Sequence, residues 1–449
     1  DRSKRATIYD FIIPNTRDYG VLKENQDFEL PAILKLQDHQ KKLMHYDNDK
    51  FLLEGVAGTG KTTILLYRFV NDIKHSRDQQ MNPEKEIIFV THNERLKKDI
   101  LASIKLFFPK EEHKMVSRCV KTISELFKSL VLDIDNYNPK NELTRRKFHT
   151  MFDKNELDLD LFWEEYRGVL RGYNLKGSSY IMGPKEYQKI GRRRGRIEQN
   201  KRNEFFEIAN DAISGGKNFS STGLNKDEIW DSLDLCREVL QRIDNDDLEC
   251  PYQCLYIDEV QDLTRAEMEI LLLLLNPDGL RRFAVAGDLS QSIQPSSFTW
   301  QALSDLIFEV LGIKIGKHET LVENYRSTPY LVDSANYILK LQSELDFEGT
   351  SELQRPFAGE NSGDPGLIFF EDEEKLIQLL NKNKLPNPAC PMLVRDKKTK
   401  EKLEKRIENS SNIITIAKFK GLERGNVLLW SPQSGSEGIL DLRSDPIRG

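Results

Sequence analysis

The stretch EGVAGTGKTT, residues 54–63, lies between the apolar runs FLLE and TILLYRFV. It fits the pattern G-x-x-x-x-G-K-[ST], in which a glycine-rich turn joins a strand to a helix. The glycines allow backbone N–H groups to close around phosphate oxygens, and the helix N-terminus adds the positive end of its dipole. The stretch therefore predicts a phosphate loop in an α/β domain.

Two side chains at the end of this loop have specific expected roles. Lys61 is expected to reach the β- and γ-phosphates of ATP, and Thr62 is expected to ligate Mg²⁺. The other loop residues predicted to contact the nucleotide are Gly55, Gly58, Thr59, Gly60 and Thr63.

A second acidic element, LYIDEVQD at 255–262, follows an apolar strand. Carboxylates at the end of a parallel strand lie beside the phosphate loop of the same sheet. Asp258 would then hold Mg²⁺, and Glu259 would polarise the attacking water. An acid-rich helix start is the alternative interpretation.

The residues between these two elements differ from the flanking α/β pattern. Residues 120–245 are charged, with a helical pattern and few strand-like runs, so we expect a domain inserted within the first α/β domain. The clusters TRRK (144–147) and GRRRGR (191–196) are either a solvated face or a surface that contacts phosphates.

The composition excludes several classes of protein. The 449 residues have a net charge of −6, which argues against a basic protein that coats nucleic acid, although local basic patches can bind it. The five cysteines do not form a zinc framework, so we expect reduced thiols. We expect no secretory signal, and the longest apolar run, ILLLLL, is too short for a bilayer. We expect an intracellular protein, cytoplasmic or nuclear, without a membrane partner.

Together with the two elements above, several shorter patterns make the chain resemble the UvrD/Rep/PcrA branch of superfamily 1 helicases. The patterns follow one another in the order of that family's motifs. These patterns are LQDHQ (36–40), VTHN (90–93), KTIS (121–124), VAGDLSQSI (285–293), VENYRST (322–328) and TIAKFKGLE (415–423).

The resemblance implies further contacts to ATP. Gln40 would bind the adenine edge, and Arg68 and Tyr325 would pack on the two faces of the adenine. Glu423 would contact the ribose. Near the γ-phosphate, Gln291 would act as a sensor, and Arg326 would be supplied from a second domain.

The resemblance also implies contacts to a nucleic acid strand. Phe298 and Trp300 are candidate stacking platforms, with core aromatics as the alternative for each. His92 is either a strand contact or a surface histidine. The predicted contacts to the strand backbone are Thr91, His92, Asn93, Thr122 and Ser124.

The implied fold is α/β, with two RecA-like phosphate-loop domains and a helical domain inserted in the first. The expected parts are an N-terminal extension (1–31), the first domain in two pieces (32–119 and 246–312), the insertion (120–245) and the second domain (313–449).

The sequence departs from the family pattern near its end. The second helical insertion that usually separates VENYRST from TIAKFKGLE is missing or vestigial. Ala417 stands where a histidine is usual, and no pattern after Glu423 matches the family's last motif. We therefore expect either an incomplete second domain in a truncated chain or a degenerate family member.

These features favour an ATP- and Mg²⁺-dependent motor on single-stranded nucleic acid, DNA rather than RNA by family likeness. The alternative is an ATP-binding switch or assembly subunit that clamps nucleic acid or a protein partner, such as a nuclease, without unwinding. A small-molecule kinase is the third class, against which the patterns around Gln291 and Arg326 argue.

Overall fold

The computed structural model describes most of the chain, and its described residues fall into two compact units, 1–364 and 365–449. The described ranges are 38–44, 49–92, 94–131, 137–151, 159–173, 181–190, 197–214, 229–291, 296, 298–316, 318–344, 353–356, 373–395, 397–419 and 426–430.

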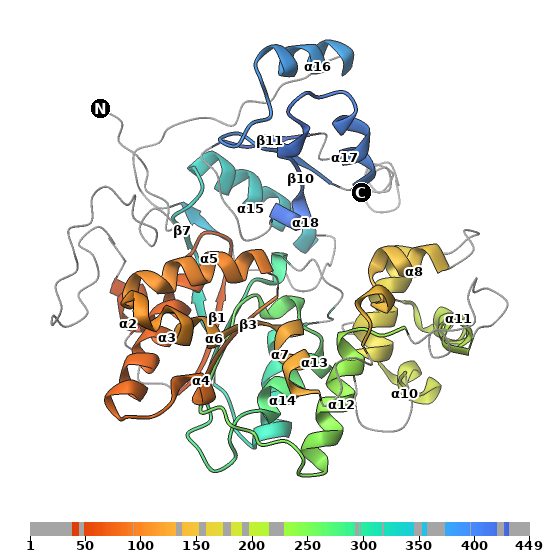
Figure 1. The fold of residues 1–449 in the computed structure, drawn as a ribbon. Coiled ribbons are helices and arrows are strands. Elements are labelled where there is room, and N and C mark those ends of the chain that lie inside the picture. The colour runs from red at the N-terminus through yellow and green to blue at the C-terminus, as the bar shows by residue number, and fades with distance from the viewer. Residues whose placement is uncertain are drawn as a thin grey trace. The chain divides into compact units, whose positions relative to one another are not determined.

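A six-stranded parallel sheet, in the order β3-β2-β4-β5-β1-β6, forms the centre of the first unit (Figure 1). Its four central strands, β2, β4, β5 and β1, are mainly apolar and buried because helices cover both faces of the sheet. This confirms the predicted α/β fold. The strands are β1 (Lys50–Gly55), β2 (Ile87–Thr91), β3 (Val120–Thr122), β4 (Cys254–Ile257), β5 (Arg282–Gly287) and β6 (Glu319–Leu321).

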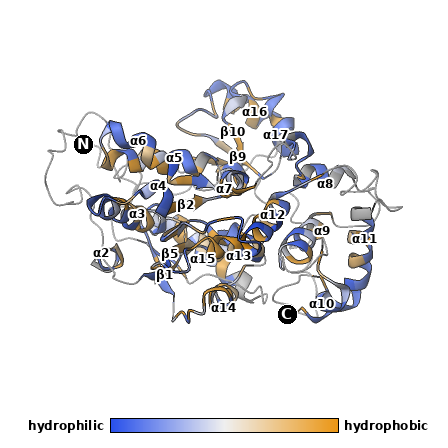
Figure 2. Cartoon of the chain, turned by 60° about the horizontal axis from the view of Figure 1, so that its bottom comes forward, coloured by the Kyte–Doolittle hydropathy of each residue, from blue (hydrophilic) through white to orange (hydrophobic). Residues whose placement is uncertain are grey.

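Alternate side chains of each strand enter different cores. In β1, Phe51 and Leu53 pack with one set of helices and Leu52 packs with the other. The first set is α2 (Asp38–Met44), α3 (Lys61–Asp78), α5 (Glu94–Ile104) and α6 (His113–Arg118). The second set is α7 (Ile123–Leu130), α12 (Ser232–Asp244), α13 (Arg265–Leu273) and α14 (Trp300–Leu311). In Figure 2 these helices carry both hydrophobic and hydrophilic residues.

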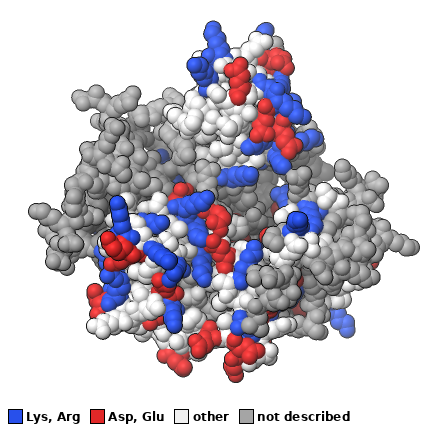
Figure 3. Space-filling view, viewed as in Figure 1, with Lys and Arg blue, Asp and Glu red and all other residues white. Residues whose placement is uncertain are grey.

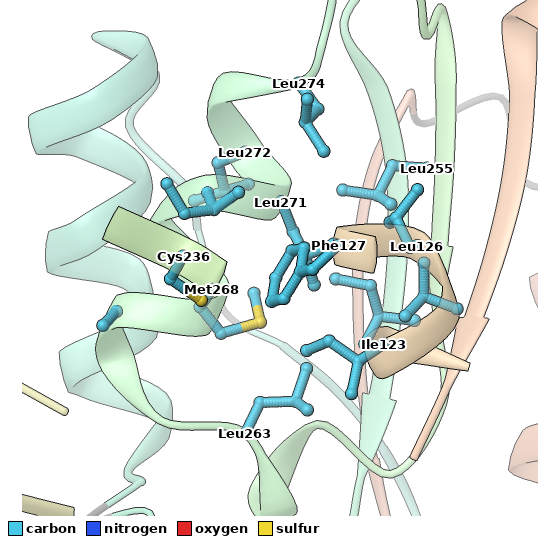
Figure 4. Packing of buried hydrophobic residues seen from close by; sticks show 14 of the residues in the cluster. Ile123, Leu126, Phe127, Cys236, Leu255, Leu263, Met268, Leu271, Leu272 and Leu274 are labelled. Atoms are coloured by element: carbon cyan, nitrogen blue, oxygen red, sulfur yellow. The ribbon is translucent and has the colours of Figure 1, made fainter. Parts of the chain in front are cut away.

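The ends of the predicted insertion belong to this first core. Strand β3 is in the sheet, and Phe127 of α7 packs near Met268 and Leu271 of α13 (Figure 4). Helix α12 packs in the same core. The structure thus places residues 120–130 and 232–244 with the sheet, although their charge had suggested the insertion.

The middle of the predicted insertion has an apolar core of its own, which includes Phe148, Phe162 and Tyr187. Its elements are α8 (Arg145–Met151), α9 (Leu159–Glu165), a π-helical segment (Tyr166–Arg171), α10 (Pro184–Lys189) and α11 (Arg202–Ser214).

Buried ion pairs join this helical part to the sheet domain. Arg171, fully buried, binds Asp231 at 2.9 Å and Asp234 at 2.7 Å, at the start of α12. Arg167 binds Glu267 of α13 at 2.9 Å. Because an arginine removed from water needs such partners, these contacts hold the π-helical segment in one position.

The rest of the first unit follows β6. Strand β7 (Glu323–Asn324) pairs in parallel with β8 (Arg355–Pro356), and α15 (Pro329–Glu344) lies between them in the chain. The short helices of this unit are α4 (Pro83–Glu86) and the 3₁₀ turns Lys105–Phe107, Lys110–Glu112, Pro139–Asn141, Gln199–Lys201, Val260–Asp262 and Leu289–Gln291.

The second unit contains a small parallel sheet in the order β10-β9-β11. Its apolar core includes Met392, Val394 and Ile413. The elements are α16 (Glu373–Lys382), β9 (Met392–Val394), α17 (Lys397–Glu404), a 3₁₀ turn (Ser410–Asn412), β10 (Ile413–Thr415), α18 (Ile416–Phe419) and β11 (Leu428–Leu429).

Among the described residues on the face in Figure 3, lysines and arginines are interspersed with acidic residues. The cluster GRRRGR (191–196) lies outside the described residues. All five cysteines have free thiols. Within the described ranges, no helix has both the length and the apolar composition needed to cross a membrane.

Candidate nucleotide site

The carboxyl ends of three adjacent strands bring the predicted catalytic segments together. In the order β4-β5-β1, the phosphate loop follows β1, Asp258 follows β4, and Asp288 follows β5. Loops at the carboxyl ends of parallel strands meet at one edge of the sheet. The sheet order therefore assembles a site from segments that are far apart in sequence.

The phosphate loop has the backbone that its glycines allow. Gly58 has φ +76° and Gly60, which precedes α3, has φ +88°, both in a region that L side chains rarely adopt. The Lys61 ammonium donates to the carbonyl oxygens of Gly55 at 2.6 Å and Val56 at 3.1 Å. The lysine head group therefore lies within the loop.

The two threonines after Lys61 present hydroxyl groups to the site. Thr62 Oγ1 donates to Asp258 Oδ2 at 2.7 Å. Thr63 Oγ1 is buried and has no hydrogen-bond partner among the described residues. A buried hydroxyl without a partner is costly, and in this place it fits a donor to a phosphate oxygen.

Asp258 is buried, with 1% of its surface exposed. Burial and the neighbouring Glu259 raise the pKa of its carboxyl to about 6, while Thr62 and Lys61 act in the opposite direction. A carboxylate and a hydroxyl are hard oxygen ligands of the kind Mg²⁺ prefers. Thr62 and Asp258 therefore fit a magnesium ion bound with a nucleotide.

Glu259 adopts an uncommon backbone conformation, with φ +59° and ψ +42°. Non-glycine residues in this region are held there by their surroundings and concentrate at functional sites. Here the carboxamide of Gln261 donates to Glu259 Oε2 at 2.5 Å, which orients the carboxylate that was predicted to polarise water.

The same carboxamide connects β4 to β5. Gln261 is fully buried, and its Oε1 atom accepts from the backbone N–H of Asp288 at 2.9 Å. Asp288 in turn accepts from the Gln291 side chain. An added Cβ at Gly287 would lie 2.7 Å from Gln261 Oε1, so only glycine allows this approach. Glu259 and Gln291 are therefore linked through Gln261 and Asp288.

The segment around Arg326 packs against the phosphate loop. The backbone N–H of Tyr325 donates to Gly58 O at 2.9 Å. An added Cβ at Gly58 would lie 2.6 Å from Arg326 Cβ and 2.6 Å from Asn324 Oδ1. The structure thus brings Arg326 to the loop that contains Lys61.

The residues predicted to contact adenine differ in how well their positions suit that role. Gln40 is buried and donates to Thr59 O at 2.9 Å, which puts it at the phosphate loop. The Tyr325 hydroxyl donates to Glu323 at 2.6 Å. Arg68 is buried over the Phe51 ring at 4.6 Å. This position favours a structural contribution of Arg68, and its packing on adenine stays a prediction.

The predicted strand contacts lie at the same edge of the sheet. Thr91 and Thr122 are register partners at the ends of β2 and β3, and both are buried. Thr122 also caps α7 by accepting from Glu125 N at 3.2 Å. His92 and Ser124 follow them and are partly buried, while Asn93 lies outside the described residues.

The two candidate platforms contact each other. Trp300 is 6% exposed and stacks on His318, with ring centroids 5.2 Å apart. Phe298 is partly buried and meets the Trp300 ring edge-on at 5.3 Å. The burial of Trp300 favours the core alternative for this residue. Glu423, the predicted ribose contact, lies outside the described residues.

Sequence reasoning assigned no role to Gln261, Asp288 or Asn324. Each lies inside a motif in which other residues have the predicted roles. In the sequence, each of the three is a polar residue among apolar and turn-forming neighbours. That pattern does not identify the residue to which its side chain hydrogen-bonds.

The fold and the site define a phosphate-loop nucleotide-binding protein of the α/β class. A family model described as the UvrD/REP helicase N-terminal domain matches residues 36–300, more than half of the chain. The chain belongs to this family of superfamily 1 helicases.

A search of curated proteins finds similarity to a much longer human protein. The chain is 25% identical over 300 residues to TPR and ankyrin repeat-containing protein 1 of Homo sapiens. The match covers 62% of this chain and 10% of that protein, so the chain spans about a tenth of the relative's length.

Proposed function

We propose that this chain hydrolyses ATP with Mg²⁺ and uses the cycle to move along single-stranded nucleic acid, DNA rather than RNA. The observation that carries the proposal is the 2.7 Å hydrogen bond between Thr62 and Asp258, which joins the phosphate loop to the acidic motif. Membership of a helicase family supports ATP, Mg²⁺ and nucleic acid as ligands.

The chain's own residues divide the chemistry among them. Bound Mg²⁺–ATP supplies the γ-phosphoryl group that is transferred to water. Lys61 and the loop amides bind the phosphates, and Thr62 and Asp258 would hold the metal ion. Glu259, oriented by Gln261, orients the attacking water and accepts its proton.

Arg326 completes the proposed site. A guanidinium that reaches the γ-phosphate stabilises the charge of the transition state. The contact of its Cβ with Gly58 supports this role, because it places the arginine beside the loop. The opening and closing of such a contact during hydrolysis can drive stepwise movement along a strand.

An ATPase assay with defined oligonucleotides tests the proposal. The wild-type chain is measured without nucleic acid and with single-stranded DNA, single-stranded RNA and duplex DNA, and Lys61→Ala serves as the inactive control. We expect stimulation by single-stranded DNA above all. A strand-displacement assay on a tailed duplex then tests for unwinding.

Each outcome has a defined meaning. ATP and strand binding without turnover would support a switch that clamps nucleic acid or a protein partner. Turnover that ignores every nucleic acid would overturn both the motor and the switch. Greater stimulation by RNA would correct the assignment of the strand.

A further inference from the structure

The side chain of Asn324 shapes the backbone that presents Arg326. Asn324 is 2% exposed, and its Oδ1 atom accepts from the backbone N–H groups of Arg326 at 2.9 Å and Ser327 at 2.8 Å. An asparagine that accepts from the residues after it forms a turn with its own side chain. The direction in which Arg326 leaves the backbone therefore depends on this carboxamide.

The other end of the Asn324 carboxamide is held by a second amide. Asn324 Nδ2 donates to Gln354 Oε1 at 2.7 Å. Gln354 is 9% exposed, and its backbone N–H and C=O exchange hydrogen bonds of 2.8 and 2.9 Å with the Asn336 side chain of α15. The amide chain Asn336–Gln354–Asn324 thus connects α15 to the turn.

The strands that carry this turn need such support. Strands β7 and β8 have two residues each, and so short a pair is weak without other contacts. All three members of the amide chain are neutral, so they hold the turn without placing negative charge near the phosphate loop. Asn324 Oδ1 also lies 2.6 Å from the position that a Cβ of Gly58 would occupy.

We propose that Asn324, held by Gln354 and Asn336, is a positioning residue that fixes Arg326 against the phosphate loop during ATP hydrolysis. This inference rests on the proposed ATPase function. A catalytic group displaced by about 1 Å loses on the order of 100-fold in rate. Loss of the Asn324 side chain should therefore lower kcat and leave ATP affinity nearly unchanged.

The test compares Asn324→Ala with Asn324→Ser. Both variants lose the hydrogen bond to Gln354, but serine keeps an oxygen that can accept from the following backbone N–H groups. We expect about a 10- to 100-fold fall in kcat for alanine, a smaller fall for serine, and a Kd for fluorescent ATP close to the wild-type value in both. Gln354→Leu, which leaves the turn oxygen in place, should also lower kcat.

Two controls separate positioning from stability. Asn381→Ala removes an asparagine with the same kind of backbone bonds, to Arg406 O and Glu408 N, in the C-terminal unit, and it should keep kcat. In an Arg326→Ala background, Asn324→Ala should cause no further loss, because the arginine that it positions is already gone.

The inference and the proposed function fail in different ways. If wild type hydrolyses ATP, Lys61→Ala does not, and both Asn324→Ala and Gln354→Leu keep the wild-type kcat, the positioning role is overturned and the ATPase assignment stands. Additive losses in the Arg326→Ala background would also overturn it. If wild type is as inactive as Lys61→Ala, the ATPase assignment fails and the positioning role fails with it.

Discussion

The hydroxyl of Thr62 donates a hydrogen bond to Asp258 over 2.7 Å, although 196 residues separate the two in the chain. Strand β5 lies between β1 and β4, the strands that precede them in the chain, and pairs with both. The contact exists because the carboxyl ends of three strands meet at one edge of the sheet.

Lys61→Ala is expected to abolish ATP turnover. The phosphate loop would lose the ammonium group that lies 2.6 Å from Gly55 O and that is expected to bind the phosphates. Steady-state phosphate release measures the effect. Lys85→Ala, an exposed lysine of α4, is the matched control and should keep the wild-type rate. Turnover near that rate in Lys61→Ala would show that the site is assigned wrongly.

Arg326→Ala is expected to slow hydrolysis by about 10³-fold while ATP still binds, since a transition-state arginine acts mainly on the rate. Nucleotide titration and single-turnover hydrolysis separate the two effects. Arg355→Ala, which changes an exposed arginine of β8, should change neither. Equal losses of affinity and rate would indicate that Arg326 is structural.

Gln261→Leu is expected to lower kcat and to destabilise the fold by about 1–3 kcal/mol, the cost of lost buried hydrogen bonds. The variant removes the donor to Glu259 and the acceptor for Asp288 N–H. Denaturant unfolding and the ATPase rate provide the two readouts. Gln253→Leu removes a similar acceptor, for Leu280 N–H, before β4 and should leave kcat unchanged. An unchanged kcat in Gln261→Leu would sink the proposed orientation of Glu259.

Glu267→Gln is expected to remove an acid-sensitive part of the stability. Burial alone would raise the pKa of Glu267, but Arg167, Ser232 and Thr264 together hold that pKa below its ordinary value of 4.5. A lowered folded pKa means that the charged group stabilises the fold above pH 4.5 and that this contribution is lost as the pH falls through the folded value.

The measurement is the free energy of unfolding of wild type and Glu267→Gln from pH 7 downward. The difference between them should be largest near neutral pH and should shrink below about pH 4.5. Glu111→Gln, at an exposed glutamate, should show a small difference at every pH. A Glu267 difference that grows on acidification would contradict the expected direction of the pH dependence.

Arg171→Met is expected to destabilise the chain by about 3–5 kcal/mol, because Asp231 and Asp234 would lose their buried partner. Thermal or denaturant unfolding measures this cost. Arg118→Met, which breaks an exposed pair with Glu84, should cost about 1 kcal/mol or less. Similar costs for the two variants would mean that Arg171 does not anchor the π-helical segment.

Much of the candidate site could be predicted because its motifs are local. The phosphate loop requires glycines at the positive φ angles of residues 58 and 60, followed at once by Lys61 and Thr62. The acidic pair after β4 follows from an apolar strand that ends in two carboxylates. Such patterns depend on neighbours along the chain, so they are visible without a structure.

The limits of the helical insertion were harder to predict. The charge of residues 120–245 suggested one separate domain, but Phe127 and Cys236 pack into the core of the sheet domain. Charged residues on the exposed side of a helix say little about which core its apolar side enters. Trp300 is a second example. Its aromatic ring suggested a stacking platform for a nucleic acid base, but in the structure the ring is buried against His318.

The sequence alone was sufficient to predict the phosphate loop, the acidic motif, the α/β class and the family. The pairing of Thr62 with Asp258, the link from Glu259 through Gln261 to Asp288, and the amide chain that ends at Asn324 became visible only in three dimensions. The physical reason is that a local pattern constrains the backbone of a few consecutive residues. A hydrogen bond between distant residues depends on which strands pair and in what register.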